Sequence, residues 1–311
     1  MKSSIPLVYF PFTVLFVDDD TELLKVYTES LGSSYKVKAV ESAPEGLKII
    51  NGQSLPKFDL LSDLNQEKIK LDEEAHEFSK ISIAFNNLLS IANDESKYDK
   101  IGIMVVDYQM PEMNGIQLCE GVENPSVKKV LLTGEFDLSR AVTALNNKKI
   151  DCFIRKGEKD TMKDLAFFIA QIKDKYFEDL TKYISSTVIM DKWKFLKDTK
   201  YIEFFYNLLE ERKICEFYFI DNNGNFLLIN DNLEKFVLVR YDDENLNEFC
   251  SFFKGEDQIS ELIAAVEKRE LIPYFGLGVE PVSVNLANWK HHFYTANKYN
   301  DFYWNIVKLP S

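Results

Sequence analysis

The sequence predicts an α/β fold: a (βα)5 domain with a doubly wound parallel sheet and a long helical insertion, followed by a smaller α+β domain. Three observations support this prediction. Short apolar runs rich in β-branched residues alternate with segments of helical periodicity along the first half, as strands buried on both faces of a parallel sheet require. Most of these runs end in a charged or hydroxyl residue. The chain of 311 residues is 46% apolar and has the length of about two domains of ~150 residues each.

The elements of the first domain follow one another in regular order. Apolar runs predict strands at residues 13–17, 35–40, 101–106, 129–132 and 152–154, and helical spacing predicts helices at 21–31, 44–50, 138–146 and from about 160 onward. We interpret the apolar start, residues 5–17, as strand, because it lacks the small-residue cleavage site of a signal peptide.

Polar side chains stand where the predicted strands end. Asp18 and Asp19 follow the first strand, Asp107 the third, Thr133 the fourth and Lys156 the fifth. The carboxyl ends of parallel strands meet at one edge of the sheet, where ligands bind. Three carboxylates brought together repel one another unless a cation neutralises them, and a hard divalent ion such as Mg²⁺ takes oxygen ligands. The sequence therefore predicts a metal site at this edge.

The segments VLFVDDD, VVDYQMPEMNG, LLTGE and FIRKG resemble the successive strand-end motifs of the receiver domains of bacterial two-component response regulators. The resemblance covers the whole first domain. It implies that a sensor histidine kinase or a phosphotransfer protein phosphorylates Asp107. It also implies that Asp18, Asp19, Asp107 and the backbone carbonyl of Gln109 hold Mg²⁺.

The resemblance assigns roles to three further residues. Lys156 supplies a fixed cation to the phosphoryl group, and the Thr133 hydroxyl can donate to a phosphoryl oxygen. Together with the acceptor Asp107, these two residues form the catalytic set. Thr133 and Phe153 match the family's switch residues, which reorient on phosphorylation and change the surface of the domain. Taken singly, an acidic turn such as residues 18–20 is usually a solvated helix N-terminus, but the order and spacing of all the motifs favour the functional interpretation.

Two features depart from the family pattern. Gly157 stands where the family usually has a proline, which predicts a looser turn after the lysine. An insertion at about residues 52–98 replaces a short loop, and its apolar residues predict one long amphipathic helix: Leu71, Ala75, Phe78, Ile81, Phe85, Leu88 and Leu89. This helix either packs on its own domain or docks a partner, another protomer or the second domain.

We divide the chain into a receiver domain at residues 1–160, a connecting helix at 161–187 and an output domain of unknown type at 188–311. The connecting helix carries an apolar stripe that reaches Tyr183 without a Pro or Gly. Its spacing suits a coiled coil in a homodimer and suits packing on its own domains equally well.

The second domain is expected to be α+β and built around a small antiparallel sheet. The sequence Asp-Asn-Asn-Gly at 221–224 predicts a hairpin between strands 215–220 and 225–229. A third strand is expected at 236–239, and helices at 192–211, 244–253 and 258–268. No familiar enzymatic motif is visible, and the aromatic stretch 289–304 with His291 and His292 is either ordinary core or a binding pocket.

Composition narrows the classes of function. The net charge is −13, and both parts are acidic when the chain is divided after Gly157, which argues against nucleic-acid binding. Four scattered cysteines indicate a reducing, cytoplasmic location, and no apolar run is long enough to cross a membrane. We therefore expect a response regulator that signals by protein or small-molecule binding. The alternatives are a phosphorylation-gated enzyme with an unfamiliar active site in 188–311, or a DNA-binding regulator with a concealed basic patch.

Overall fold

The computed structural model describes residues 2–53, 90–134, 137–157, 161–187, 193–221, 223–279 and 281–310. Among these residues, 9–53 and 90–187 form one compact unit, and 2–8 and 193–310 form another. The helix predicted at residues 71–89 of the insertion lies outside the described residues.

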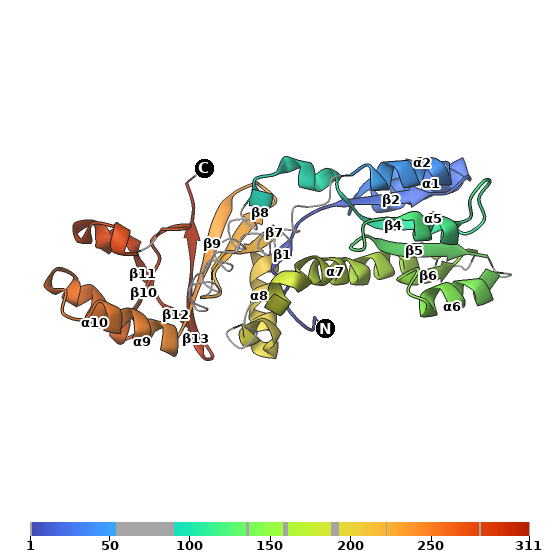
Figure 1. Ribbon diagram of the computed structural model, residues 1–311. Coiled ribbons are helices and arrows are strands. Elements are labelled where there is room, and N and C mark those ends of the chain that lie inside the picture. The colour runs from blue at the N-terminus through green and yellow to red at the C-terminus, as the bar shows by residue number, and fades with distance from the viewer. Residues whose placement is uncertain are drawn as a thin grey trace, which may run out of the picture. The chain divides into compact units, whose positions relative to one another are not determined.

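The first unit is built on a five-stranded parallel sheet, which confirms the predicted α/β fold (Figure 1). Its strands are β2 (Thr13–Val17), β3 (Lys36–Val40), β4 (Ile101–Asp107), β5 (Lys128–Thr133) and β6 (Cys152–Arg155), in the spatial order β3-β2-β4-β5-β6. The direction of winding reverses between β2 and β4. Such a switch point opens a crevice beyond the carboxyl ends of the two strands.

Helices connect these strands, and most begin at a side-chain cap. They are α1 (Thr21–Leu31), α2 (Ala43–Asn51), α5 (Gly115–Gly121), α6 (Leu138–Asn146) and α7 (Thr161–Thr187), with a 3-10 turn, η1 (Glu95–Asp99), before β4. Asp20 caps α1, Ser42 caps α2, and Asn114 forms a capping box with Gln117 at the start of α5.

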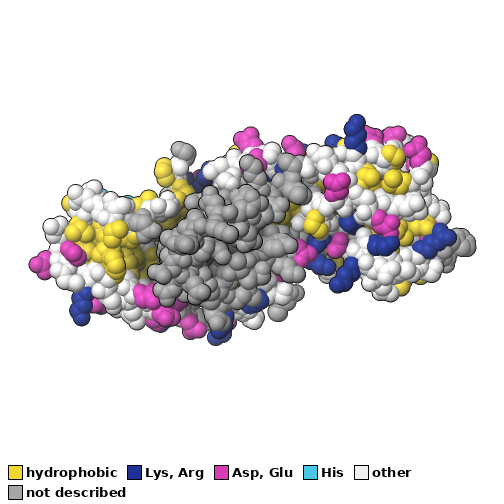
Figure 2. Space-filling view, viewed as in Figure 1, with side chains coloured by type: hydrophobic (Ala, Val, Ile, Leu, Met, Phe, Trp, Pro, Cys, Tyr) yellow, Lys and Arg dark blue, Asp and Glu magenta, His cyan; other side chains and the backbone are white. Residues whose placement is uncertain are grey.

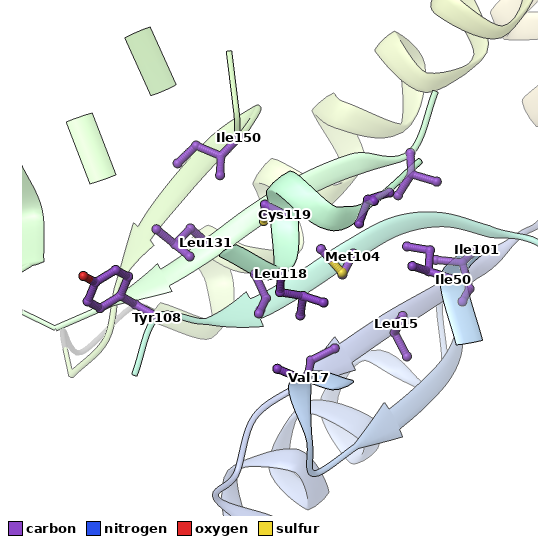
Figure 3. Close-up of a cluster of buried hydrophobic side chains, with 14 of the residues drawn as sticks. Leu15, Val17, Ile50, Ile101, Met104, Tyr108, Leu118, Cys119, Leu131 and Ile150 are labelled. Atoms are coloured by element: carbon purple, nitrogen blue, oxygen red, sulfur yellow. The ribbon is translucent and has the colours of Figure 1, made fainter. Parts of the chain in front are cut away.

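The core of the first unit lies on both faces of the sheet. Leu15, Val17 and Met104 pack with Leu118 and Cys119 of α5 in the cluster drawn in Figure 3. On the other face, the ring of Phe16 stacks on Tyr27 of α1 at 5.0 Å between centroids. Every residue of β2 and β4 is buried, as the continuous apolar runs predicted.

The second unit holds a six-stranded sheet in the order β1-β7-β8-β9-β13-β12 and a two-stranded sheet β10-β11. The strands are β1 (Val8–Tyr9), β7 (Ile214–Phe219), β8 (Phe226–Asn230), β9 (Lys235–Asp242), β10 (Leu271–Pro273), β11 (Phe293–Thr295), β12 (Asn297–Tyr299) and β13 (Phe302–Lys308). The helical elements are η3 (Lys194–Lys197), α8 (Thr199–Glu211), α9 (Asp243–Phe252), η4 (Asp257–Ile259), α10 (Ser260–Glu267), η5 (Pro281–Ser283) and η6 (Leu286–His292). The predicted hairpin and the α+β class are confirmed.

Two element predictions were wrong. Residues 5–17 are not one strand, because Pro11, which has no N–H, lies between β1 and β2, and the two strands belong to different sheets. The helix expected from residue 192 begins only at Thr199. Asp198 caps it by accepting from the Tyr201 N–H at 2.9 Å, so the preceding residues form the separate turn η3.

Across the described ranges, no helix is both long and apolar enough to cross a membrane.

Candidate functional site

The predicted carboxylates come together at the switch point of the first sheet. Asp18 directly follows β2 and Asp107 is the last residue of β4. One ligand oxygen from each of Asp18, Asp19 and Asp107 lies within 4.8 Å of the others. Asp18 is 1% exposed and Asp107 7% exposed, while Asp19 is open to solvent. The cluster therefore has a buried floor and an accessible rim.

Lys156, just after β6, holds the two buried carboxylates together. Its Nζ lies 2.7 Å from Asp18 Oδ2 and 2.8 Å from Asp107 Oδ1. Burial raises the pKa of Asp107 above its usual value, and the hydrogen bond from Lys156 opposes that shift. Burial by itself would lower the pKa of Lys156, but its hydrogen bonds to Asp107 and Asp18 raise it on balance. The lysine thus stays charged.

The donor set fits a divalent cation such as Mg²⁺. Three carboxylates and one ammonium group leave two negative charges in excess, and all the available donor atoms of the cluster are hard oxygens. Asp18, Asp19 and Asp107 could hold the ion, and the Gln109 carbonyl belongs to the loop that leaves β4.

The three aspartates at residues 18–20 have two different roles, one in the carboxylate site and one at the start of α1. The Asp20 N–H donates to Asp18 Oδ1 at 3.0 Å, which fixes the first carboxylate. Asp20 itself accepts from the N–H groups of Glu22 and Leu23 and so caps α1. Asp20 therefore stabilises the start of α1, where a negative side chain is favourable. Asp18 and Asp19 belong to the carboxylate cluster.

The predicted switch residues lie on the two neighbouring strands. Thr133 ends β5, is fully buried, and donates its hydroxyl to the Gly134 carbonyl at 3.2 Å. Its own carbonyl accepts from the Lys156 N–H at 2.9 Å, which joins the ends of β5 and β6. Phe153 of β6 is half-buried and packs against the core cluster of Figure 3.

Gly157 forms a turn that the family's usual proline does not allow. Its φ is +86°, whereas the proline ring holds φ near −65°. A left-handed residue after Lys156 is favourable only for glycine or a few small polar residues. Proline therefore cannot adopt the turn after Lys156, and glycine adopts it without strain.

Sequence reasoning missed two residues beside this site. Asp137, at the start of α6, accepts from Gln109 Nε2 at 2.7 Å, and Arg140 donates to the Tyr108 hydroxyl at 2.6 Å. Both contacts join residues about thirty positions apart, and no local pattern marks either residue.

The aromatic stretch at residues 289–304 contributes to the core of the second unit. Trp289 is fully buried and donates its Nε1 to the Val284 carbonyl at 3.1 Å. His292 stacks on Phe275 with the ring centroids 5.1 Å apart, while His291 is exposed. Trp289 and His292 thus pack against other aromatic side chains of the second unit.

The order of the first sheet and the strand-end cluster are those of a receiver domain, and over its full length the chain resembles a response regulator. That protein is the response regulator LqsR of Legionella pneumophila, whose structure has been solved. The identity is 25%, the TM-score is 0.75, and the alignment covers 100% of this chain and 91% of that one.

Two further similarities cover part of the chain. An adenylate cyclase from Rhodopirellula baltica is 22% identical over 57% of this chain and 96% of that one, with a TM-score of 0.38. A CheY-like receiver protein of Methanospirillum hungatei is 22% identical over 54% of this chain and 98% of that one, with a TM-score of 0.36. No family model and no curated protein matches the sequence.

Proposed function

We propose that a sensor histidine kinase or a phosphotransfer protein phosphorylates Asp107, and that the second unit passes the signal on by protein or small-molecule binding. One observation carries this proposal: the Asp107 carboxylate lies at the switch point of a receiver fold, within reach of two further carboxylates and of the Lys156 ammonium group. A carboxylate in such surroundings is a competent nucleophile toward a phosphoryl group.

Each residue of the site would have a defined task. An Asp107 oxygen forms a bond to phosphorus while the bond from phosphorus to the histidine nitrogen of the partner breaks. Lys156, which already lies 2.8 Å from Asp107 Oδ1, holds the negative phosphoryl oxygens. Asp18, Asp19 and the Gln109 carbonyl would hold Mg²⁺ together with Asp107. Bound Mg²⁺ withdraws charge from the phosphoryl oxygens.

The switch would begin at Thr133. Its hydroxyl donates to the neighbouring Gly134 carbonyl, a contact that costs little to exchange for a phosphoryl oxygen. Phe153 lies on the neighbouring strand β6, and its half-buried ring would move toward the core when Thr133 rotates. A change of charge at Asp107 would in this way alter the surface around β6 and α6.

The charges on the surface support an output other than nucleic-acid binding. On the face of the first unit seen in Figure 2, basic side chains are interspersed with acidic ones and form no basic field. The net charge of −13 points the same way.

A homodimer through residues 161–187 would need a face of α7 other than its main apolar stripe. That stripe is already buried in its own unit at Leu165, Ile169, Tyr176 and Leu180. Phe167, on another side of the helix, is 58% exposed and is available to a second copy.

The test is incubation of the full chain with acetyl phosphate and Mg²⁺, followed by mass measurement and gel filtration. We expect a Mg²⁺-dependent phosphoryl adduct on the wild type and none on Asp107→Asn. Asp20→Asn is the matched control, because it changes the neighbouring aspartate and asparagine also caps a helix. An adduct that persists in Asp107→Asn, or its absence from the wild type, would contradict the proposal.

A further inference from the structure

Two side-chain hydrogen bonds tie the loop after β4 to the beginning of α6. Gln109 donates its Nε2 to Asp137 Oδ2 at 2.7 Å, and Arg140 donates its NH1 to the Tyr108 hydroxyl at 2.6 Å. Arg140 NH1 also lies 3.9 Å from Asp137 Oδ1. Tyr108, Gln109, Asp137 and Arg140 thus form a clasp between the two loops that flank Asp107 and Thr133.

The carboxylate of Asp137 is placed in this clasp at a cost. Asp137 is only 7% exposed, and a buried carboxylate is unfavourable unless hydrogen bonds compensate for its lost hydration. It occupies the N-cap position of α6, yet its side chain makes no capping hydrogen bond. Aspartate at this position normally accepts from the backbone of the first turn. Asp137 instead accepts from Gln109, so it stabilises the loop after β4 and not the first turn of α6.

Gln109 needs such support. It follows Asp107 by two residues, and its exposed side chain belongs to a loop in which Glu112 has a φ of +68°. The sheet side of the loop is anchored, because the Tyr108 N–H donates to the Leu132 carbonyl at 2.8 Å. The Asp137 hydrogen bond fixes the next residue along the chain. Residues that orient a metal ligand contribute strongly to metal affinity even though they do not touch the ion.

We propose that Asp137 is a positioning residue for the metal site: by holding the side chain of Gln109 it holds the Gln109 carbonyl ready for Mg²⁺. This inference rests on the proposed function, which assigns that carbonyl to the metal. Asp137 also stands four residues after Thr133 in the same connection. The clasp therefore links occupation of the metal site to the position of the amino end of α6.

The decisive substitution is Gln109→Ala, because it removes the side chain and leaves the backbone carbonyl in place. We expect the dissociation constant for Mg²⁺, measured by calorimetry on the full chain, to rise about 10-fold or more in Gln109→Ala and in Asp137→Ala. The double variant should bind Mg²⁺ no more weakly than either single variant, because both changes break the same contact. Asp137→Asn, which keeps an acceptor oxygen, should recover most of the affinity.

Ser139→Ala serves as the control, since Ser139 is an exposed residue of α6 outside the clasp. Wild-type affinity in Gln109→Ala, or fully additive losses in the double variant, would overturn the positioning role. If Asp137→Ala fails to fold, Gln109→Ala and Asp137→Asn still decide the question. A wild type that neither binds Mg²⁺ nor forms the phosphoryl adduct would overturn the proposed function and this inference together. A wild type that does both, with silent clasp variants, would overturn this inference alone.

Discussion

Gly115 lies where the backbone around Asp107 leaves no space for a side chain. A Cβ atom at this position would stand 2.3 Å from the Asp107 carbonyl oxygen and 2.8 Å from Leu131 Cδ1. The Gly115 N–H donates to the Tyr108 carbonyl at 3.0 Å, and this hydrogen bond holds the start of α5 close to the end of β4. The first residue of α5 must therefore be glycine for the Asp107 loop to close over the core.

We expect Gly115→Ala to lower the free energy of unfolding by about 1–3 kcal/mol, the usual cost of overpacking. The better helix propensity of alanine offsets part of this loss. Urea unfolding measures the effect. Gly134→Ala is the matched control, because a Cβ there meets nothing within 4 Å. Equal midpoints for the two variants would show that the Asp107 loop adjusts freely.

At the scale of elements, α7 is held by a cluster of aromatic rings. Phe177 is fully buried, and its ring lies within 5.1 Å of the rings of Tyr9, Phe10 and Tyr176, measured between centroids. Phe12 joins the cluster through Tyr176 at 5.1 Å. Such contacts add to the hydrophobic gain of burial. The segment before β2 and the middle of α7 thus stabilise one another.

Phe177→Ala should lower the free energy of unfolding by about 3–5 kcal/mol, because it leaves a cavity in this cluster. Phe167→Ala is the control on the same helix and should change the stability by less than about 0.5 kcal/mol, since Phe167 is 58% exposed. Chemical denaturation of the two variants beside the wild type measures the difference. A small effect for Phe177→Ala would mean that α7 is held elsewhere.

The turn between β6 and α7 gives a second prediction at this scale. Replacing Gly157 by proline restores the family's usual residue, but we expect it to destabilise this chain, because φ cannot reach +86° in proline. Gly157→Ala should cost less, about 1 kcal/mol. Thermal unfolding ranks the three proteins. Stability equal to the wild type in Gly157→Pro would show that the turn changes conformation without cost.

At the scale of the whole molecule, the start of the chain belongs to the second unit. Ile5, Leu7 and Val8 are buried, the Phe219 N–H donates to the Leu7 carbonyl at 2.7 Å, and the Ile5 N–H donates to the Leu196 carbonyl at 2.9 Å. The second unit is thus completed by residues that precede the receiver domain in sequence. Residues 193–310 alone therefore do not make up the whole second unit.

Removal of residues 2–8 should therefore weaken the second unit more than the receiver domain. We expect faster amide hydrogen exchange in β7, which loses its neighbour β1, while exchange in β4 stays at the wild-type rate. Mass spectrometry of peptic fragments compares the two strands in one experiment. Unchanged exchange across β7 would show that the leading residues are dispensable for this sheet.

The sequence by itself determined the parallel sheet, its strand-end residues and the two classes of unit. The reason is that these features are local: a buried strand needs a continuous apolar run, and Asp18, Asp107, Thr133 and Lys156 stand directly after such runs. The helix α7 could be predicted for the same reason, because its apolar residues recur at helical spacing within one continuous segment.

Only the tertiary structure decided which distant residues meet. The clasp between Gln109 and Asp137, the pairing of β1 with β7 and the left-handed turn at Gly157 leave no periodic signal in the sequence. The β13 strand was missed because its aromatic run also suits a binding pocket, and its pairing with β9 joins residues far apart in the chain. Contacts of this kind depend on the packing of the whole unit, so they cannot be derived from any single segment.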